Sequence, residues 1–335
     1  MSVDVSVVMA TYNRSEFLGA AMDSILAQSF RNWELLVVDD GSTDDTPMLL
    51  EGYARRDARI KIVRQPNQGV AAARNRGIEL ASGACLTIQD SDDLSDASRL
   101  QVCWDYLHDH ADRTGVIHNV ASIDAVGKPI WFYRPKFMFP GLFMRTSALR
   151  QVGGFRPFFR CMEDRDLLRR LEEAQLIMDV LPRTLYYRRR NYGGGRLSRD
   201  IECSFYSFCE YASLHMRRSG RADPFDDMKN LADGMALAKQ ALPTFPPAAQ
   251  AGGRACLIAA YAKAVRMCIL HGQWRRALTY IGDAGRDVRA CGGSALGARR
   301  LQLGLVLKLP LYYLSSQAWP AYRALSWPLR AVRPK

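Results

Sequence analysis

Residues 33–42, WELLVVDDGS, form an apolar run that ends in two adjacent aspartates. Residues 84–93, ACLTIQDSDD, repeat this pattern and end in three aspartates. In a parallel sheet the ends of such strands lie at one edge, which is where α/β folds bind ligands. Negative charges gathered at that edge favour a cation, so the sequence predicts a divalent metal that holds a phosphorylated ligand.

The first hundred residues alternate between apolar runs and helical patterns. Strands are expected near residues 5–10, 33–38, 60–64 and 84–89, and the apolar spacing within residues 17–26 favours a helix with one buried face. This alternation predicts an α/β fold in which helices flank a Rossmann-like, mostly parallel sheet.

The pattern changes class in the second half of the chain. Residues 115–190 contain short strand-like runs and a helix that begins near Met162, whereas the chain from residue 201 onward is helical. We therefore expect two domains, an α/β domain over residues 1–200 and a helical, basic C-terminal region over residues 201–335.

The charge of the chain is unevenly spread. Residues 254–335 hold fourteen Lys and Arg and only two Asp, which accounts for the whole formal charge of +12. A basic end of this kind suits an anionic surface such as lipid headgroups. Nucleic acid is disfavoured as a partner, because long aliphatic stretches separate the aromatic and basic residues.

The longest apolar run near the end, residues 301–314, is interrupted by Lys308 and Pro310. It falls short of the roughly 20 apolar residues that a spanning helix needs. We expect a helix that lies on a membrane surface or on the first domain.

The eight cysteines form no CxxC pair and no zinc-binding pattern with histidine. They lie in apolar or helical runs, where a free thiol behaves as a small hydrophobic side chain. The first apolar run begins almost at once and lacks a basic flank, so it is interpreted as a strand rather than as an export signal. These features predict free thiols and a reducing cytoplasm.

Four blocks follow one another in the first domain. They are residues 5–14 (VSVVMATYNR), 38–44 (VDDGSTD), 67–77 (NQGVAAARNRG) and 90–93 (DSDD). Together they resemble the successive motifs of family 2 glycosyltransferases with the GT-A fold, over about residues 3–200. Neither a Gly-rich dinucleotide turn nor a P-loop occurs. The resemblance implies transfer of a sugar from a nucleotide-diphospho-sugar.

The resemblance also implies roles for single residues. Tyr12 would lie against the nucleotide base, and Asp39 would accept a hydrogen bond from a uracil-like imide. Asp90 would face the ribose or the sugar, and Asp92 would ligate Mn²⁺ or Mg²⁺. The whole set expected to bind the donor is Thr11, Tyr12, Asp39, Arg74 and Asp90.

Several of these residues also have an ordinary structural explanation. Tyr12 is then a loop aromatic, Asp39 a turn residue and Arg74 a solvated helix charge. Asp92 and Asp93 can cap the helix that follows them.

Residues 162–171, MEDRDLLRRL, contain a candidate catalytic base. Asp164 shares a helical stripe with the leucines at 167, 168 and 171, so it is expected to face inward, whereas Glu163, on the side of Asp166 and Arg170, should be more exposed. Such an acid can remove the proton from an acceptor hydroxyl. It can equally be a helix-terminal charge stabilised by the dipole. The family's Glu-Asp block, whose second acid is the base, also points to Asp164.

A glycine-rich basic segment follows at residues 188–199. Many relatives place a histidine near the metal here, but this chain has Arg190 and Asn191, which leaves a third metal ligand open.

The predicted protein is thus a metal-dependent, inverting glycosyltransferase that adds a single sugar. The polymer synthases' Gln-x-x-Arg-Trp block is absent. The expected donor is a UDP-sugar, and the expected acceptor is a glycan or a lipid-linked intermediate of cell-surface polysaccharide synthesis. The expected location is the cytoplasm, on the inner face of an anionic membrane. The alternative is a non-catalytic protein that binds sugar nucleotides or assists assembly.

Overall fold

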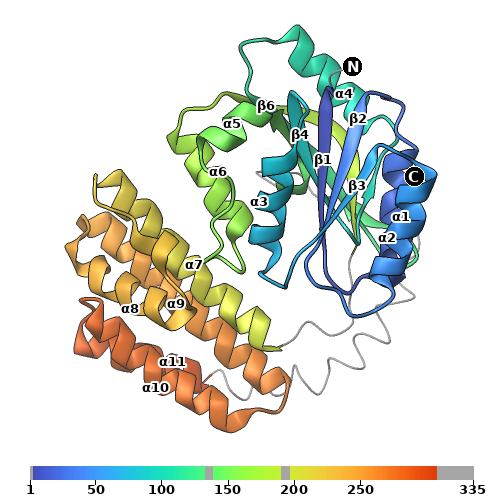
Figure 1. The fold of residues 1–335 in the computed structure, drawn as a ribbon. Helices are drawn as coiled ribbons and strands as arrows, with labels where there is room; N and C mark the ends of the chain where they lie inside the picture. Colours follow the sequence, from blue (N-terminus) through green and yellow to red (C-terminus); the bar gives the residue numbers. More distant parts are fainter. Residues whose placement is uncertain (1–2, 133–138, 190–196, 308–335) are drawn as a thin grey trace. The chain divides into compact units, whose positions relative to one another are not determined.

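The computed structural model describes residues 3–132, 139–189 and 197–307 (Figure 1). The chain forms two compact units. The first comprises Met1–Pro157 and Glu163–Asn191, and the second comprises Phe158–Met162 and Tyr192–Lys335. The boundary between the units therefore lies between residues 191 and 192, except that the short segment Phe158–Met162 belongs to the second unit.

The first unit is built on a sheet whose parallel half agrees with the prediction. Four strands pair in parallel in the order β3-β2-β1-β4, and they are β1 Val5–Thr11, β2 Trp33–Asp39, β3 Ile60–Arg64 and β4 Cys85–Asp90.

The rest of the sheet mixes the two directions. The order continues from β4 through β8 Leu142–Arg145, β6 Gly115–Ile123, β9 Met178–Arg189 and β5 Leu94–Ser95, and β7 Pro129–Phe132 pairs with β6. Strands β6 and β9 are parallel, while β8 is antiparallel to both β4 and β6. Within the described residues the sheet is thus mixed, and the predicted parallel order holds for its first four strands.

Helices cover both faces of this sheet (Figure 1). Their bounds are α1 Ser15–Leu26, α2 Thr46–Arg56, α3 Val70–Leu80, α4 Arg99–Asp109, α5 Thr146–Gln151 and α6 Glu163–Glu173. Side chains alternate along a strand, so Val7 packs in one core with α1, α2 and α4, while Val8 packs in the other with α3, α5 and α6. Burial on both faces explains the largely apolar runs of β1, β2 and β4.

The second unit is helical, as expected. Its helices are α7 Leu197–Arg218, α8 Leu231–Ala241, α9 Pro247–Leu270, α10 Trp274–Ala290 and α11 Ala295–Leu307. All of them contribute to one apolar core. Gly272, with a φ of 71°, makes the turn between α9 and α10. In the part of the chain that the structure describes, none of the helices combines the length and the apolar character that crossing a bilayer requires.

One expectation about the cysteines is wrong. Cys161 and Cys203 form a disulfide, although the sequence predicted that all the cysteines are free. They are 42 residues apart in the chain, and the packing of Phe158–Met162 with α7 in the second unit brings them together. The six other cysteines, all among the described residues, form no disulfide, and five of these are buried.

Candidate active site

Three of the predicted residues lie at the carboxyl edge of the parallel strands. Thr11 ends β1, Asp39 ends β2 and Asp90 ends β4. Thr11 is paired in register with Asp39, and its neighbour Ala10 is paired with Asp90. The strand register therefore brings these side chains to one edge.

Hydrogen bonds join the loops that follow β1 and β2. The backbone N–H of Asn13 donates to Ser42 Oγ (2.9 Å), and that of Thr43 donates to Asn13 Oδ1 (2.8 Å). Asn13 adopts a φ of 51°, which asparagine tolerates better than most residues. Tyr12, in this first loop, is 45% exposed. Its ring is thus available to a ligand at this edge.

Two buried oxygen atoms at this edge have unsatisfied hydrogen-bonding capacity. Asp39 Oδ1 accepts from the backbone N–H of Ser42 (2.9 Å). Oδ2 lies 3.2 Å from Arg64 Nε as an ion pair but accepts no hydrogen bond within the described residues. Thr11 Oγ1 is likewise buried without a hydrogen-bond partner there. Buried polar atoms are nearly always bonded, so these two mark a place for a ligand or water.

Asp40 holds the loop that leads into α3. Its carboxylate accepts from Gln65 Nε2 (2.8 Å) and from the backbone N–H groups of Gln68 (2.9 Å) and Gly69 (2.8 Å). Gly69, with a φ of 92°, directly precedes the helix. The second aspartate of the first acidic pair therefore orders a loop, a role that sequence reasoning missed.

Arg74 on α3 connects two carboxylates. Its Nη2 donates to Asp90 Oδ1 (2.8 Å), and its Nη1 donates to Glu163 Oε1 (2.8 Å). The rings of Phe139 and Phe155 lie with their centroids 5.5 and 5.2 Å from the guanidinium carbon. Burial alone would lower the pKa of Arg74, but the acids around it raise that pKa above its ordinary value. Arg74 is therefore a buried, charged group and not a solvated one.

The aspartates after β4 crowd together. Burial, and then the charge of Asp90, raise the pKa values of Asp92 and Asp93. Asp93 Oδ1 accepts from the backbone N–H of Arg189 (2.7 Å), while Asp92 Oδ2 lies 3.7 Å from Arg14 Nε. Asp93 thus bonds to the backbone of β9, and the role of Asp92 as a metal ligand stays a prediction.

A buried arginine supports the strand that carries these aspartates. Arg99 donates to Gln89 Oε1 (3.2 Å) and to Thr87 Oγ1 (2.6 Å), and Gln89 Nε2 donates to the carbonyl oxygens of Asp90 and Asp93. Burial lowers the pKa of His118 to about 3, so its neutral ring accepts from Arg99 Nε (3.0 Å). The acidic turn therefore rests on a rigid polar network.

The residues fit a cation that shares its ligands with a phosphorylated molecule. Asp90 raises the pKa of Asp92, and a nearby positive charge would relieve that repulsion. Among the described residues no group of three or more His, Cys, Asp or Glu is placed to hold a metal. A cation here would need oxygens from a diphosphate or from water, as is usual for Mg²⁺. Arg190 and Asn191 lie outside the described residues.

The prediction that Glu163 and Asp166 of helix α6 are exposed is wrong. Glu163, expected to be exposed, is 13% exposed and bonded to Arg74. Asp166, expected on the same open side, is fully buried between Arg156 and Arg170. Pairing with arginine makes the burial of these two carboxylates possible. The apolar stripe of the helix alone does not reveal such pairing.

Asp164 is half-buried. Its Oδ1 accepts from the backbone N–H of Arg165 (2.7 Å). Burial raises the pKa of Glu163, and the charge of the adjacent Asp164 adds to that rise; Asp164 also contributes, after Asp90 and Glu163, to the raised pKa of Arg74. The predicted base thus interacts electrostatically with the buried ion pair, and its catalytic role stays a prediction.

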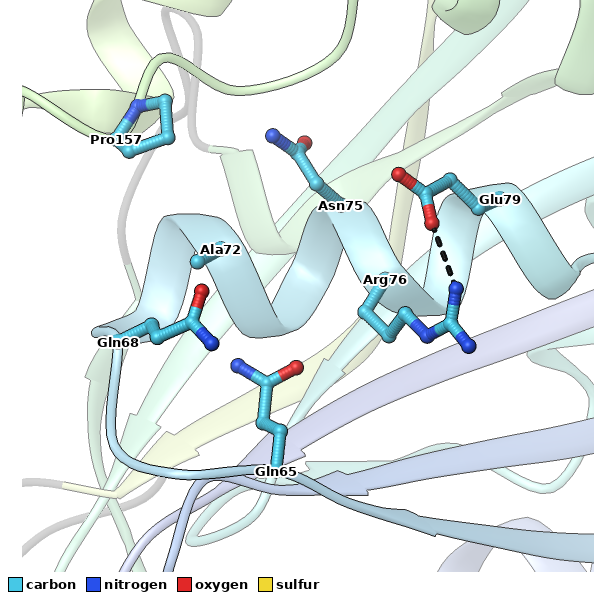
Figure 2. Close-up of a pocket in the computed structure, with 7 residues that line it drawn as sticks. All are labelled: Gln65, Gln68, Ala72, Asn75, Arg76, Glu79 and Pro157. Atoms are coloured by element: carbon cyan, nitrogen blue, oxygen red, sulfur yellow. Dashed lines mark hydrogen bonds and ion pairs between the residues drawn. The ribbon is translucent and has the colours of Figure 1, made fainter.

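A separate cavity of about 370 Å³ lies along the other side of α3 (Figure 2). None of the residues predicted for the site lines it. Its lining mixes polar and apolar surface and consists of Gln65, Gln68, Ala72, Asn75, Arg76, Glu79 and Pro157. Gln65 and Gln68 connect it to Asp40.

Comparison with known sequences identifies relatives of the first unit. The model of the family described as "Glycosyl transferase family 2" matches residues 6–172. The putative glycosyltransferase EpsE of Bacillus subtilis is 36% identical over an alignment of 187 residues that covers 51% of this chain and 67% of that protein. The glycosyltransferase GlyG of Streptococcus pneumoniae is 34% identical over 159 residues, 47% of this chain and 52% of that protein. The chain thus spans about half to two thirds of the length of these two relatives.

Solved structures with this fold cover nearly the whole chain. Residues 1–349 of S. aureus TarS, in complex with UDP-GlcNAc, match with a TM-score of 0.56 and 19% identity, over 95% of this chain and 92% of that one. The mannosyltransferase PcManGT from Pyrobaculum calidifontis, in complex with GDP-Man and Mn²⁺, matches with a TM-score of 0.54 and 18% identity, over 97% and 85%. At such identities the likeness concerns the fold, and the predicted fold class is confirmed.

Proposed function

Because this chain belongs to glycosyl transferase family 2, we propose that it is a metal-dependent, inverting glycosyltransferase. It moves one sugar from a nucleotide-diphospho-sugar, a UDP-sugar by preference, to a hydroxyl of a glycan or lipid-linked acceptor in cell-surface polysaccharide synthesis. The observation that carries the proposal is the set of buried atoms without a hydrogen bond at the strand edge. Within the described residues these are Thr11 Oγ1, Asp39 Oδ2 and Arg74 Nε.

The donor is held by groups from three strand ends. The ring of Tyr12 lies against the nucleobase, and Asp39 Oδ2 accepts from a uracil-like imide N–H. Asp90 faces the ribose or the sugar beside Arg74, and Asp92 holds Mn²⁺ or Mg²⁺. The cation, when bound, supplies positive charge to the diphosphate leaving group.

Asp164 performs the proton transfer. Its carboxylate takes the proton of the acceptor hydroxyl while the hydroxyl oxygen attacks the anomeric carbon. The bond from that carbon to the diphosphate breaks on the opposite side, so the product has the inverted configuration. Arg74 keeps positive charge close to this reaction without titrating, because the surrounding acids raise its pKa.

A donor screen tests the proposal. We expect at least one sugar nucleotide, with Mn²⁺, to raise the melting temperature of the purified protein, and Asp39→Ala to abolish the shift. Glu79→Gln, at an exposed residue outside the predicted site, is the matched control and should behave like wild type. The absence of any thermal shift and any turnover across the panel would contradict the proposal.

Asp164→Asn separates transfer from binding. A glycosyltransferase that uses this base should bind the donor with unchanged affinity and lose transfer. Unchanged transfer by the variant would remove Asp164 as the base. A wild-type protein that binds donor but transfers no sugar to any acceptor tested would instead favour the non-catalytic alternative.

We infer a peripheral position on the cytoplasmic face of an anionic membrane, and the surface of α11 supports the membrane contact. On α11 the exposed Leu296, Leu303 and Leu307 follow helical spacing, and the exposed Arg299 and Arg300 lie on the same side. Leucines interleaved with arginines suit the interface of an anionic bilayer, where a lipid-linked acceptor is found. The competing explanation is a helical lid with a solvated basic face.

Vesicle sedimentation distinguishes these explanations. Deletion of residues 288–335, or Leu303→Glu alone, should reduce binding to vesicles that contain phosphatidylglycerol. Val126→Glu, at an exposed apolar residue of the first unit, is the control. Undiminished binding after the deletion, combined with altered turnover, would favour the lid.

A further inference from the structure

The proposed base depends on its helix for its position. Asp164 is the second residue of α6, and its carboxylate bonds to the backbone N–H of the next residue. Within the described residues no side chain forms a hydrogen bond with the Asp164 carboxylate. The direction of this carboxylate is therefore set by whatever holds the first turn of α6.

Glu163 provides that anchor. It is the first residue of α6, its side chain is 13% exposed, and its Oε1 accepts from Arg74 Nη1 at 2.8 Å. Because Glu163 directly precedes Asp164, a bond that fixes its side chain also restrains the backbone from which Asp164 projects.

Arg74 is itself a rigid point of attachment. Its side chain is 7% exposed and lies near the rings of Phe139 and Phe155. One turn further along, α3 approaches β1 so closely that a Cβ on Gly77 would lie 2.3 Å from Val8 Cγ1. The arginine therefore projects from a helix that is pressed against the centre of the sheet.

The later turns of α6 have a separate anchor. Asn75, next to Arg74, exchanges two hydrogen bonds with the backbone of Phe155 (2.7 and 2.8 Å). Arg170 donates to the carbonyl of Gly154 (2.6 Å) and to Asp166 (2.9 Å). The loss of Glu163 would thus loosen the first turn of α6 while these bonds keep the rest of the helix in place.

We propose that Glu163 is a positioning residue, which through Arg74 holds the proposed base Asp164 in register with the donor. The inference rests on the proposed function. Arg74 bonds with one nitrogen to Asp90, a proposed donor contact, and with the other to the helix of the base. One planar guanidinium therefore sets the separation between the donor side and the acceptor side of the site.

Steady-state kinetics test this role. We expect Glu163→Ala to lower kcat about 10- to 100-fold, because small displacements of a reacting group have effects of this size, while the KM for the donor changes less than about threefold. Glu163→Gln should recover most of kcat, since its amide oxygen still accepts from Arg74. Glu172→Ala, on the exposed side of the same helix, is the matched control and should leave kcat unchanged.

Hydrogen exchange gives a second readout that needs no turnover. The amides of Leu167 and Leu168 bond to the carbonyls of Glu163 and Asp164 in an α-helix, so they should exchange faster in Glu163→Ala. Exchange in α3 should stay at the wild-type rate. Equal exchange in wild type and Glu163→Ala would overturn the inference.

The outcomes separate the two proposals. A wild-type protein without transfer would refute the proposed function, while exchange would still decide whether Glu163 holds the first turn of α6. If wild type transfers sugar, Asp164→Asn does not, and Glu163→Ala keeps the wild-type kcat, then only the positioning role fails. A loss of donor affinity in proportion to kcat would also overturn it, because Glu163 would then act on binding.

Discussion

Thr11, at the residue scale, is a buried polar group whose cost in stability would be explained by the proposed role in donor binding. Its hydroxyl lies at the strand edge without a hydrogen-bond partner among the described residues. Thr46, in contrast, is equally buried, but its Oγ1 accepts from the backbone N–H of Arg14 (3.0 Å). These two threonines therefore form a matched pair for mutation.

Thr11→Val should keep or raise the free energy of unfolding, by up to about 1 kcal/mol, because it removes an unsatisfied buried polar group. The same change should weaken UDP binding several-fold. Thr46→Val should lower the free energy of unfolding by about 1 kcal/mol, since it orphans the N–H of Arg14. Urea denaturation and calorimetry with UDP measure both effects. A large loss of stability in Thr11→Val without a change in affinity would contradict the assignment.

Glu34 predicts an acid-dependent loss of stability. Burial alone would raise its pKa, but Lys61, Ser6 and Ser82 hold that pKa at about 2, below the ordinary 4.5. A lowered carboxyl pKa stabilises the fold fully above the unfolded value, and this stabilisation is lost as the pH falls from 4.5 towards 2.

The contribution of Glu34 is about 3 kcal/mol, at 1.36 kcal/mol for each pKa unit. The difference in unfolding free energy between wild type and Glu34→Gln should therefore shrink by this amount between pH 4.5 and pH 2. Glu79→Gln, which removes one partner of an exposed ion pair, is the control, and its free energy of unfolding should change with pH as that of wild type does. A constant difference for Glu34→Gln across this range would show that its carboxylate is not held in this way.

At the element scale, two glycines in helices show how packing opposes helix propensity. Alanine at Gly77 would place its Cβ 2.3 Å from Val8 Cγ1 in the core, whereas a Cβ on Gly52 of α2 meets nothing within 4 Å. Both changes gain about 1 kcal/mol of helix propensity. Overpacking at residue 77 costs about 1–3 kcal/mol, which is equal to or larger than that gain.

Gly52→Ala should therefore raise the free energy of unfolding by up to about 1 kcal/mol. Gly77→Ala should lower it and also weaken donor binding, because Arg74 and Gly77 belong to the same turn of α3. Thermal melts and calorimetry with UDP measure these effects. Stabilisation by both substitutions would mean that α3 does not press on β1 as described.

Elements with a clear sequence period were predicted well. The four parallel strands follow from their apolar runs, which are most continuous in β1, β2 and β4 because these strands are buried on both faces. Helix α1 follows instead from the helical spacing of its apolar residues. Short pairings such as β5 with β9 were not predicted, since two residues carry no period. Whether a third metal ligand exists near Arg190 and Asn191 was left open by the sequence, and both residues lie outside the described part of the chain.

The site was predictable in position but not in its contacts. Aspartates at strand ends indicate the edge where Thr11, Asp39 and Asp90 meet. The hydrogen bond from Arg74 to Glu163 joins residues that are 89 apart in the sequence, so no local spacing predicts it. For the same reason the burial of Glu163 was missed, although the arginines around α6 were a signal that acids there could be paired.

At the scale of the whole molecule, the disulfide changes the expected redox behaviour. Cys161→Ser together with Cys203→Ser should lower the free energy of unfolding by about 2–4 kcal/mol under non-reducing conditions. Addition of reductant should lower the free energy of unfolding of the wild-type protein to that of the double variant. Thiol titration of the denatured, unreduced protein should find six free thiols. A count of eight thiols would mean that the disulfide is absent and that the sequence-based expectation of free cysteines was correct.

The bonds between the loops after β1 and β2 bear on the kinetics of association. Asn13, Ser42 and Thr43 are already bonded to one another before any nucleotide arrives. Little conformational entropy would then remain to be lost when the proposed nucleotide binds near Tyr12 and Asp39. Association at this edge of the sheet should scale with solvent viscosity, as encounter by diffusion does, and show no slow rearrangement phase.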